Sequence, residues 1–410
     1  MHTCVEAADA VPAETQPEWG AVFAMTLGVF GLITAEFLPA SLLTPMAASL
    51  QVTEGMAGQT VTATAAVALV TSLFISVVTR STDRRHVLLA FSVLLVGSNL
   101  LVAFAPNLTV VLLGRVLLGM AIGGFWTMSA ATAMRLVPEA MVPRALSIIF
   151  SGVSVATVAA APLGSYFGHL IGWRNVFLIA TGIGVLAFLW QLVTLPRMPS
   201  NGSARMGTLI DVMKRPAMGV GMLAVTLVFT GHFAFFTYLR PFLETVTGVS
   251  VNGLSGVLLG FGIANFVGTS LAGFVLERNL RLTLLLMPAA MGAMALALVV
   301  LGRAPTADAV LVAFWGMAFG AVPVAWTTWI TRTVPDEAES GGGLIVAAVQ
   351  LAITLGAAVG GVVFDATGAK GVFVGSAVVL LLAAGTIATG LRAGATDRRA
   401  ADFAGDVDEA

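Results

Sequence analysis

Long stretches almost without charge recur along this chain, and each is long enough to cross a lipid bilayer as an α-helix. A membrane-spanning helix needs about 20 predominantly apolar residues. Charged residues make up 10% of the chain and hydrophobic residues 58%, whereas soluble domains carry about 25% charged residues. The sequence therefore predicts an all-α membrane protein with twelve transmembrane helices. The predicted spans are residues 19–43, 55–79, 87–105, 108–134, 145–169, 175–195, 216–240, 252–276, 282–302, 309–331, 340–364 and 371–391.

The longest polar interruption follows the sixth predicted span and reads "RMPSNGSARMGTLIDVMKRP". A polar stretch between two sets of six helices is typical of a linker, so we predict two six-helix bundles. The predicted organisation is a cytoplasmic tail at 1–18, an N-terminal bundle at 19–196, a cytoplasmic linker at 197–215, a C-terminal bundle at 216–392 and a cytoplasmic tail at 393–410.

The distribution of Lys and Arg predicts the orientation in the membrane. With a cytoplasmic N-terminus, the inside segments hold fifteen basic residues and the outside loops only four, namely Arg174, Arg240, Arg303 and Lys370. This excess satisfies the positive-inside rule, so we expect both termini in the cytoplasm. The net charge of −1 gives no sign of a nucleic-acid partner, and the single cysteine, Cys4, excludes an intramolecular disulfide.

Short motifs recur between the two predicted halves at a nearly constant spacing. The clearest pairs are "GMAIG" at 119–123 with "GMAFG" at 316–320, "RLVPE" at 135–139 with "RTVPD" at 332–336, and "GWRNVF" at 172–177 with "GAKGVF" at 368–373. The motif "DRR" at 83–85 has a weaker counterpart in "ERNLR" at 277–281. Such repeats predict two pseudo-symmetric bundles that rock around a site near the midplane, which is alternating access.

Three segments resemble signatures of the major facilitator superfamily in its drug:proton antiporter branch. "TDRR" at 82–85 is similar to the loop signature between the second and third helices, although the opening glycine is absent and Thr79 stands near its place. "GRVLLGMAIGG" at 114–124 resembles the fourth-helix motif with its intramembrane arginine. "SGVSVATVAAAPLGSYFG" at 151–168 resembles the Gly/Pro-rich fifth-helix motif.

Over nearly the whole chain, the sequence is also similar to bacterial efflux pumps for purine ribonucleosides within this superfamily. The segments that carry this resemblance include "EFLPASLLTPMA", "GGFWTMSA", "MRLVP", "IGWRNVF" and "FAFFTYLRP". The resemblance implies proton-coupled efflux of inosine, guanosine, adenosine and purine analogues across the bacterial inner membrane. The expected partners are the purine nucleoside, protons and the lipid bilayer, and we expect a monomer.

Two other functions stay open at this point. Neighbouring families on the same scaffold export sugars or drugs such as chloramphenicol, and a non-transporting membrane sensor or scaffold is an alternative of another class. The sequence contains no nucleophile–base pair, metal-ligand cluster or cofactor fingerprint. We therefore expect neither an enzyme nor a bound cofactor.

Polar residues inside the predicted spans are candidates for proton coupling, because ionisable side chains at membrane depth are costly and mark function. Glu36 lies about 25 Å along the first span from Trp19. A carboxyl there, wetted alternately from each side, can carry a proton inward while cargo moves outward. The alternative is an acid that bonds permanently to a neighbouring helix or reaches the outer interface. The carbonyl that Pro39 leaves without its donor lies nearby and suits either interpretation.

Arg115 and His232 are the other two candidates for proton coupling. The repeat places Val312 at the position that matches Arg115, so the fold does not require an arginine there. We interpret Arg115 as a residue that steadies Glu36 or another carbonyl group, or that modulates proton release. Anchoring of a helix end is its structural alternative. An unperturbed histidine titrates near pH 6.5, which suits proton transfer, but a lone helical histidine also serves as a bonded structural residue or a cargo contact.

A purine nucleoside needs aromatic faces for stacking and neutral hydrogen-bonding groups. Such side chains occur at mid-helix depth, although each has a structural alternative, since aromatic residues often face lipid and amides often bond across helices. The candidate cargo-binding residues are Trp126, His232, Phe236, Tyr238, Asn265, Trp326 and Gln350.

Charged residues at the predicted cytoplasmic loops of the two halves are candidates for gating. Matched acid–base sets at helix ends can lock two bundles together in one state and release them in the other, whereas a solvated charge run would only set topology. The candidate gating residues are Asp83, Arg84, Arg85, Glu277, Arg278 and Arg281.

Overall fold

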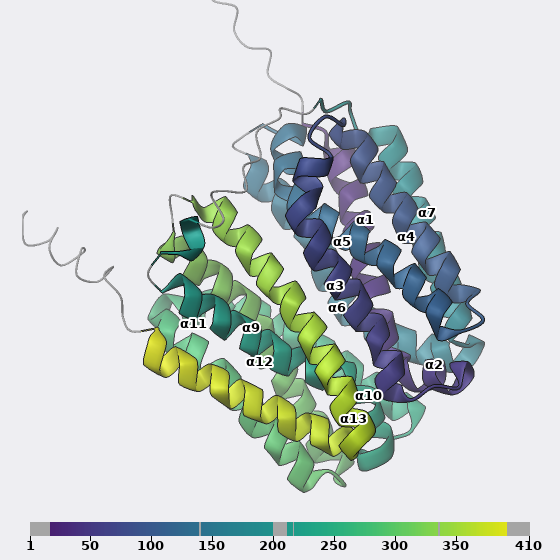
Figure 1. The fold of residues 1–410 in the computed structure, drawn as a ribbon, viewed down its shortest axis with the longest axis vertical. Coiled ribbons are helices and arrows are strands. Elements are labelled where there is room, and N and C mark those ends of the chain that lie inside the picture. The colour runs from purple at the N-terminus through teal and green to yellow at the C-terminus, as the bar shows by residue number, and fades with distance from the viewer. Residues whose placement is uncertain (1–16, 139–140, 200–210, 216, 335–336, 392–410) are drawn as a thin grey trace, which may run out of the picture.

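The protein's structure is a computed structural model that describes residues 17–138, 141–199, 211–215, 217–334 and 337–391. Within these ranges the chain is almost entirely helical and contains no β-strand (Figure 1). Most of the predicted tails, and residues 200–210 of the predicted linker, lie outside the described residues. The long helices are α1 (Trp19–Ser41), α3 (Glu54–Val78), α4 (Arg84–Ala103), α5 (Leu108–Leu136), α6 (Val142–Ile171), α7 (Trp173–Thr194), α9 (Met218–Thr237), α11 (Val251–Leu301), α12 (Pro305–Thr333) and α13 (Ala338–Gly390).

Two of these helices each contain a pair of membrane spans. Eleven helical stretches of the described chain are long and apolar enough to cross a membrane, and Gly341–Gly390 is the longest, with 50 residues. A continuous helix of that length would measure about 75 Å, against about 30 Å for the hydrocarbon core. The backbone of α13 is non-helical at Gly368, and that of α11 at Asn279. The eleven stretches already count the two parts of α11 separately, so division of α13 at Gly368 gives the predicted twelve spans.

Short helical elements lie where the sequence predicted loops or span ends. α2 (Leu43–Leu50) follows α1 almost directly, and α9 is followed by α10 (Leu239–Phe242) and the π-helical turn η2 (Leu243–Thr247). The predicted span 216–240 therefore ends early, at Thr237. The reason is Pro241, which has no N–H to donate to the carbonyl four residues before it.

The two halves contain the same close helix crossing. In each half, two glycines four residues apart leave no room for a Cβ atom against carbonyl oxygens of a neighbouring helix. The contacts are Gly119 with Thr64 and Gly123 with Ala68, between α5 and α3, and Gly316 with Phe261 and Gly320 with Asn265, between α12 and α11. Every residue of the first crossing lies 197 positions before its counterpart. The repeat of GMAIG and GMAFG is thus a repeat of structure, since a bulkier residue would separate these helices.

The helix breaks follow the same repeat. Gly172, between α6 and α7, has a φ of 82°, and Gly368, which divides α13, has a φ of 74°. These two positions are 196 residues apart. Only glycine adopts this left-handed conformation without strain, so the paired glycines mark the same turn between the fifth and sixth helix of each bundle.

The two bundles meet through α3 with α13 and through α6 with α11. One hydrophobic cluster contains residues from both bundles, including Ala40, Leu43 and Ala57 of the first and Phe236 and Leu239 of the second. Figure 1 shows this junction where α2, α10 and the middle of α13 come together. We call this part, formed by residues 41–55, 238–250 and 361–370, the α2 end.

Replacing Gly320 by alanine should destabilise the protein, because the added Cβ atom would collide with the backbone of α11. Overpacking of this kind costs about 1–3 kcal/mol. Gly260→Ala on α11 is the matched control, since nothing lies within 4 Å of a Cβ atom there. Thermal unfolding of the purified variants in detergent measures the difference. Equal melting temperatures for the two variants would contradict the close crossing.

Candidate functional site

Glu36 and Arg115 lie next to each other where proline interrupts the hydrogen bonds of α1. Pro39 has no N–H, so the carbonyl of Ala35 lacks its usual intrahelical donor. Arg115 of α5 supplies that donor: its Nη2 lies 2.8 Å from the Ala35 oxygen and 3.5 Å from the Glu36 carbonyl oxygen. Arg115, for which the sequence predicted a bond to Glu36 or a nearby carbonyl, therefore bonds the Ala35 carbonyl that Pro39 leaves free.

The Arg115 guanidinium is fully buried, and only its Nη2 makes hydrogen bonds to described residues. Its Nε and Nη1 have no hydrogen-bond partner among the described residues. The Glu36 carboxyl, on the residue next to Ala35, is the charged group that interacts with it electrostatically. Glu36 itself is 9% exposed. A buried charge is strongly destabilising without a partner, so the charge of Arg115 depends on the carboxylate beside it.

His232 lies in a cluster of aromatic side chains from three helices of the second bundle. Its Nδ1 accepts a hydrogen bond of 3.1 Å from Nε1 of Trp315. Its ring lies parallel to that of Phe319, with 3.2 Å between centroids, and stacks more distantly with Phe236 at 5.8 Å. We call the group His232, Phe233, Phe236, Phe261, Trp315 and Phe319 the aromatic cluster.

The aromatic cluster reaches the contact between the two bundles. Phe236 of α9 lies 5.4 Å from Phe37 of α1 and 5.4 Å from Phe261 of α11, measured between ring centroids. Phe37 directly follows Glu36 in the sequence. The structure thus brings three predicted residues, Glu36, His232 and Phe236, to one region where a bundle contact must open during any rocking motion.

Three predicted cargo residues take part in helix packing in this conformation, and their role in cargo binding stays a prediction. The Tyr238 hydroxyl donates to the Ala357 carbonyl at 3.0 Å, and its ring fills the space beside Gly58 and Gly361. Asn265 Nδ2 donates to the Gly316 carbonyl at 3.3 Å, across the α11–α12 crossing. Trp326 lines a space inside the second bundle and packs edge-on against Trp329.

Trp126 and Gln350 are not members of the aromatic cluster. Trp126 keeps part of its ring surface exposed, and Gln350 keeps one oxygen without a hydrogen bond to the described residues. The Trp126 ring is partly exposed and stacks on Phe150 of α6, with 5.7 Å between centroids. Gln350 is buried on α13, and its Oε1 has no hydrogen-bond partner among the described residues. Their assignment to cargo binding stays a prediction.

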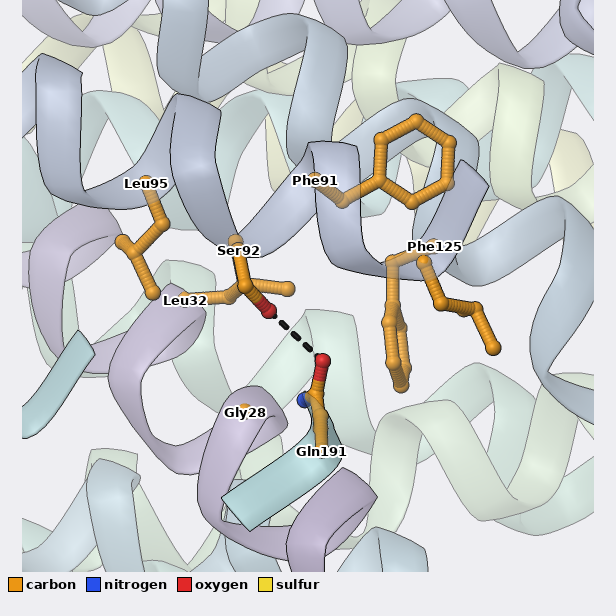
Figure 2. A pocket seen from close by; sticks show the side chains of 8 residues that line it. Gly28, Leu32, Phe91, Ser92, Leu95, Phe125 and Gln191 are labelled. Atoms are coloured by element: carbon orange, nitrogen blue, oxygen red, sulfur yellow. Dashed lines mark hydrogen bonds between the residues drawn. The ribbon is translucent and has the colours of Figure 1, made fainter. Parts of the chain in front are cut away.

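A small cavity of about 10 Å³ lies within the first bundle (Figure 2). Its polar groups are satisfied, because Ser92 Oγ donates to Gln191 Oε1 at 2.7 Å and Gln191 Nε2 donates to the Ala24 carbonyl at 3.3 Å. None of the predicted cargo residues lines it. The cavity is therefore a gap between α1, α4, α5 and α7, away from the bundle contact.

The predicted gating residues bond to their own bundles in this conformation. Arg85 Nη2 donates to the Leu192 carbonyl at 2.7 Å, and Arg281 Nη2 donates to the Ala388 carbonyl at 3.0 Å. Arg278 lies over the ring of Phe274, and the backbone N–H of Arg84 donates to the Met198 carbonyl. The described residues of this set form no bond between the bundles, so the latch remains a prediction for another state.

The geometry also corrects the alignment of the two gating motifs. Asp83 Oδ1 accepts from the backbone N–H groups of Arg85 and Met198, and Asn279 Oδ1 accepts from that of Leu282. Asn279 lies 196 residues after Asp83, so it is the counterpart of Asp83. Glu277 is not, and its side chain lies outside the described residues. Partial burial raises the pKa of Asp83, but the two backbone hydrogen bonds with nearby positive charge hold that pKa below its usual value.

Two residues that the sequence did not place in the site join the bundles at the α2 end. Asp365 of α13 accepts from Thr53 Oγ1 at 2.8 Å and from the backbone N–H of Gly55 at 3.2 Å. It thereby caps the N-terminus of α3, where unpaired N–H groups favour an anion. Arg240, interpreted from the sequence only as the end of a helix, donates to the Ser41 carbonyl and pairs with Glu244 at 2.8 Å.

A second buried carboxylate was also missed. Asp308, in the first turn of α12, is fully buried, and its Oδ2 accepts from Thr247 Oγ1 at 2.7 Å. It was not singled out from the sequence, because it lies at the edge of a predicted span. The turn η2 covers it instead, and no sequence signal locates that turn over α12.

Comparison with known proteins gives a family and a consistent set of relatives. Residues 25–353 match the model of the Major Facilitator Superfamily. Proteins named Purine ribonucleoside efflux pump NepI from Salmonella typhimurium and Salmonella typhi are each 49% identical over 377 residues, which is 92% of this chain and 95% of theirs.

Solved structures show the same fold at low sequence identity. A D-xylose-proton symporter has a TM-score of 0.75 at 14% identity, covering 92% of this chain and 98% of that one. A bacterial homolog to the human lysosomal transporter Spinster, in an inward-facing and occupied conformation, has a TM-score of 0.71 at 17% identity, covering 91% of this chain and 96% of that one.

Replacing Asp365 by alanine should open the α2 end, because α3 loses the cap that ties it to α13. Spin labels at Ala48 and Lys370, two exposed positions, report the separation by pulsed electron paramagnetic resonance, with the single native cysteine, Cys4, replaced by serine. We expect longer distances in Asp365→Ala than in the background protein. Thr367→Ala is the control, since Thr367 bonds only within α13. Unchanged distances in Asp365→Ala would contradict this role.

Proposed function

This chain belongs to the Major Facilitator Superfamily, and we propose that it exports purine ribonucleosides across the bacterial inner membrane in exchange for protons. The observation that supports purine ribonucleosides as the cargo is the 49% identity, over 92% of the chain, to efflux pumps named for these compounds. The described helices make it a multi-pass membrane protein, and the paired bundles support alternating access as the transport mechanism.

The aromatic cluster is the proposed contact for the purine base. Flat heterocycles stack on aromatic rings, with about 1–3 kcal/mol per base. Phe236 and Phe261 are buried in the second bundle, and Phe236 meets Phe37 of the first. Cargo inserted between the bundles at this level would touch both of them. A site shared by both bundles is what alternating access requires.

Glu36 is the proposed proton carrier, and Arg115 is the group that controls it. When Glu36 is ionised, its charge offsets that of the buried guanidinium. When it takes up a proton, Arg115 keeps its bond to the Ala35 carbonyl, which Pro39 leaves free in both states. The guanidinium therefore stays in place while the carboxyl changes charge, so protonation alters the electrostatics of the bundle contact without unfolding α1.

The orientation predicted from Lys and Arg makes the α2 end the outer end, with both termini and the 197–215 linker in the cytoplasm. The bonds of Asp365 and Arg240 between the bundles then close the outer side. The Asp83 and Arg281 loops lie on the inner side and bond to their own bundles. We propose that this conformation faces the cytoplasm and that the gating residues meet when the carrier turns outward.

Gradient-driven uptake of labelled inosine into everted membrane vesicles tests the proposal, because export from the cell becomes uptake by such vesicles. We expect wild-type vesicles to accumulate inosine under an imposed proton gradient. Glu36→Gln should fall to the level of vesicles without the protein, because its side chain cannot release a proton. Inosine exchange without a gradient should persist in Glu36→Gln, since the aromatic cluster is unchanged.

Asp308→Asn is the matched control for this experiment. It also removes a buried carboxylate, but asparagine retains an acceptor for Thr247, and the hydrogen bond between Asp308 and Thr247 stays within the second bundle. We expect gradient-driven uptake to continue in this variant. Normal uptake by Glu36→Gln would contradict the role of Glu36, and vesicles that ignore inosine but accumulate a sugar or chloramphenicol would contradict the cargo.

A further inference from the structure

Trp315 determines the protonation state of His232 through one hydrogen bond. The indole Nε1–H lies 3.1 Å from Nδ1 of the imidazole, and both side chains are buried. An indole nitrogen can only donate, so Nδ1 must accept with its lone pair. The proton of the neutral ring is then on Nε2.

Packing holds both partners of this bond. The imidazole ring is within 1° of parallel to Phe319 on α12 and within 14° of parallel to Phe236 on α9. The indole of Trp315 stacks on Phe235 with 3.7 Å between centroids, and Phe235 in turn packs against Phe373 of α13. Neither ring can turn away without disturbing at least one of these contacts.

The Nε2–H group of the fixed His232 ring remains as a hydrogen-bond donor. A charged imidazolium would direct an N–H at the N–H of Trp315, so this geometry favours the neutral form. Nε2 makes no hydrogen bond to any described residue. The neighbouring side chains of the aromatic cluster are apolar phenylalanines, which accept no conventional hydrogen bond. The rings of the aromatic cluster therefore leave the Nε2–H donor without an acceptor.

We infer that Trp315 is a positioning residue that holds His232 as a neutral Nε2–H donor to an acceptor atom on the base of the cargo. This inference rests on the proposed function. Purine bases suit the arrangement, because they combine a flat face with ring nitrogens, and in inosine and guanosine a carbonyl, that accept hydrogen bonds. His232 then recognises cargo, and proton transfer is left to Glu36.

The tautomer of His232 can be observed directly by nitrogen NMR. The protein has four histidines, so replacing His2, His86 and His169 by glutamine leaves His232 as the single labelled ring. In the otherwise wild-type protein we expect one tautomer, protonated at Nε2. Trp315→Phe keeps an aromatic ring but removes the donor, so both tautomers should appear. Trp329→Phe, the same change on the same helix, packs against Gly221 and should retain the single tautomer.

Transport of inosine gives the second readout. Trp315→Phe should raise KM roughly fivefold to tenfold, which corresponds to one weakened hydrogen bond, with little change in maximal rate. His232→Gln should rescue binding relative to His232→Leu, because the amide can accept from Trp315 and still donate to cargo. If His232 only filled space, His232→Gln and His232→Leu would impair inosine transport equally.

The outcomes separate this inference from the proposed function. A wild-type His232 protonated at Nδ1, or charged, overturns the positioning role without any transport measurement, even if Trp315→Phe fails to fold. A single tautomer that survives in Trp315→Phe overturns it as well. If the wild type shows the expected tautomer but carries no purine nucleoside, the proposed cargo fails and the base-acceptor contact fails with it, whereas the fixed tautomer stands.

Discussion

The need to satisfy backbone hydrogen-bonding groups inside a membrane determines where the charged residues of this protein lie. Lipid offers no donor or acceptor, so any carbonyl or N–H released by a helix break must find a protein partner. The Ala35 carbonyl, freed by Pro39, binds Arg115, and the Ser41 carbonyl at the end of α1 binds Arg240. The free N–H of Gly55 at the start of α3 binds Asp365. Each of these side chains completes a helix, and two of them join the bundles.

The repeat gives the two bundles equivalent backbones, but the charged and aromatic side chains differ between them. The glycine crossings at Gly119 and Gly316 and the turns at Gly172 and Gly368 match position by position. Arg115, in contrast, has Val312 as its counterpart, and the aromatic cluster lies in the second bundle only. Phe37, which follows Glu36 in the first bundle, contacts Phe236 of the aromatic cluster in the second. In the proposed function, proton transfer at Glu36 and cargo binding at the aromatic cluster therefore both act close to this contact.

Sequence alone predicted the features that depend on local composition. The twelve spans follow from apolar stretches, and Glu36, Arg115 and His232 stood out as polar residues within them. The carbonyl freed by Pro39 was also predicted, because a missing N–H is a property of the residue itself. The short helices α2 and α10 were missed because both lie directly beside predicted spans, where composition does not mark a separate helix. Trp315, Asp365 and the packing of Tyr238 were missed because their meaning depends on partners more than 80 residues away.

The contact between Phe37 and Phe236 has a consequence for how tightly cargo and movement are linked. Rocking the bundles apart at this level separates two rings that pack at an angle of 59° and exposes them to water, which opposes the motion of an empty carrier. In the proposed function, a flat base lying on Phe236 replaces the lost ring, so the loaded carrier keeps an aromatic contact as it opens. The bound base then occupies the position that an aromatic side chain of the protein fills in the closed contact. If cargo binds there as proposed, the carrier resists cycling without cargo, because an aromatic ligand lowers the barrier to opening.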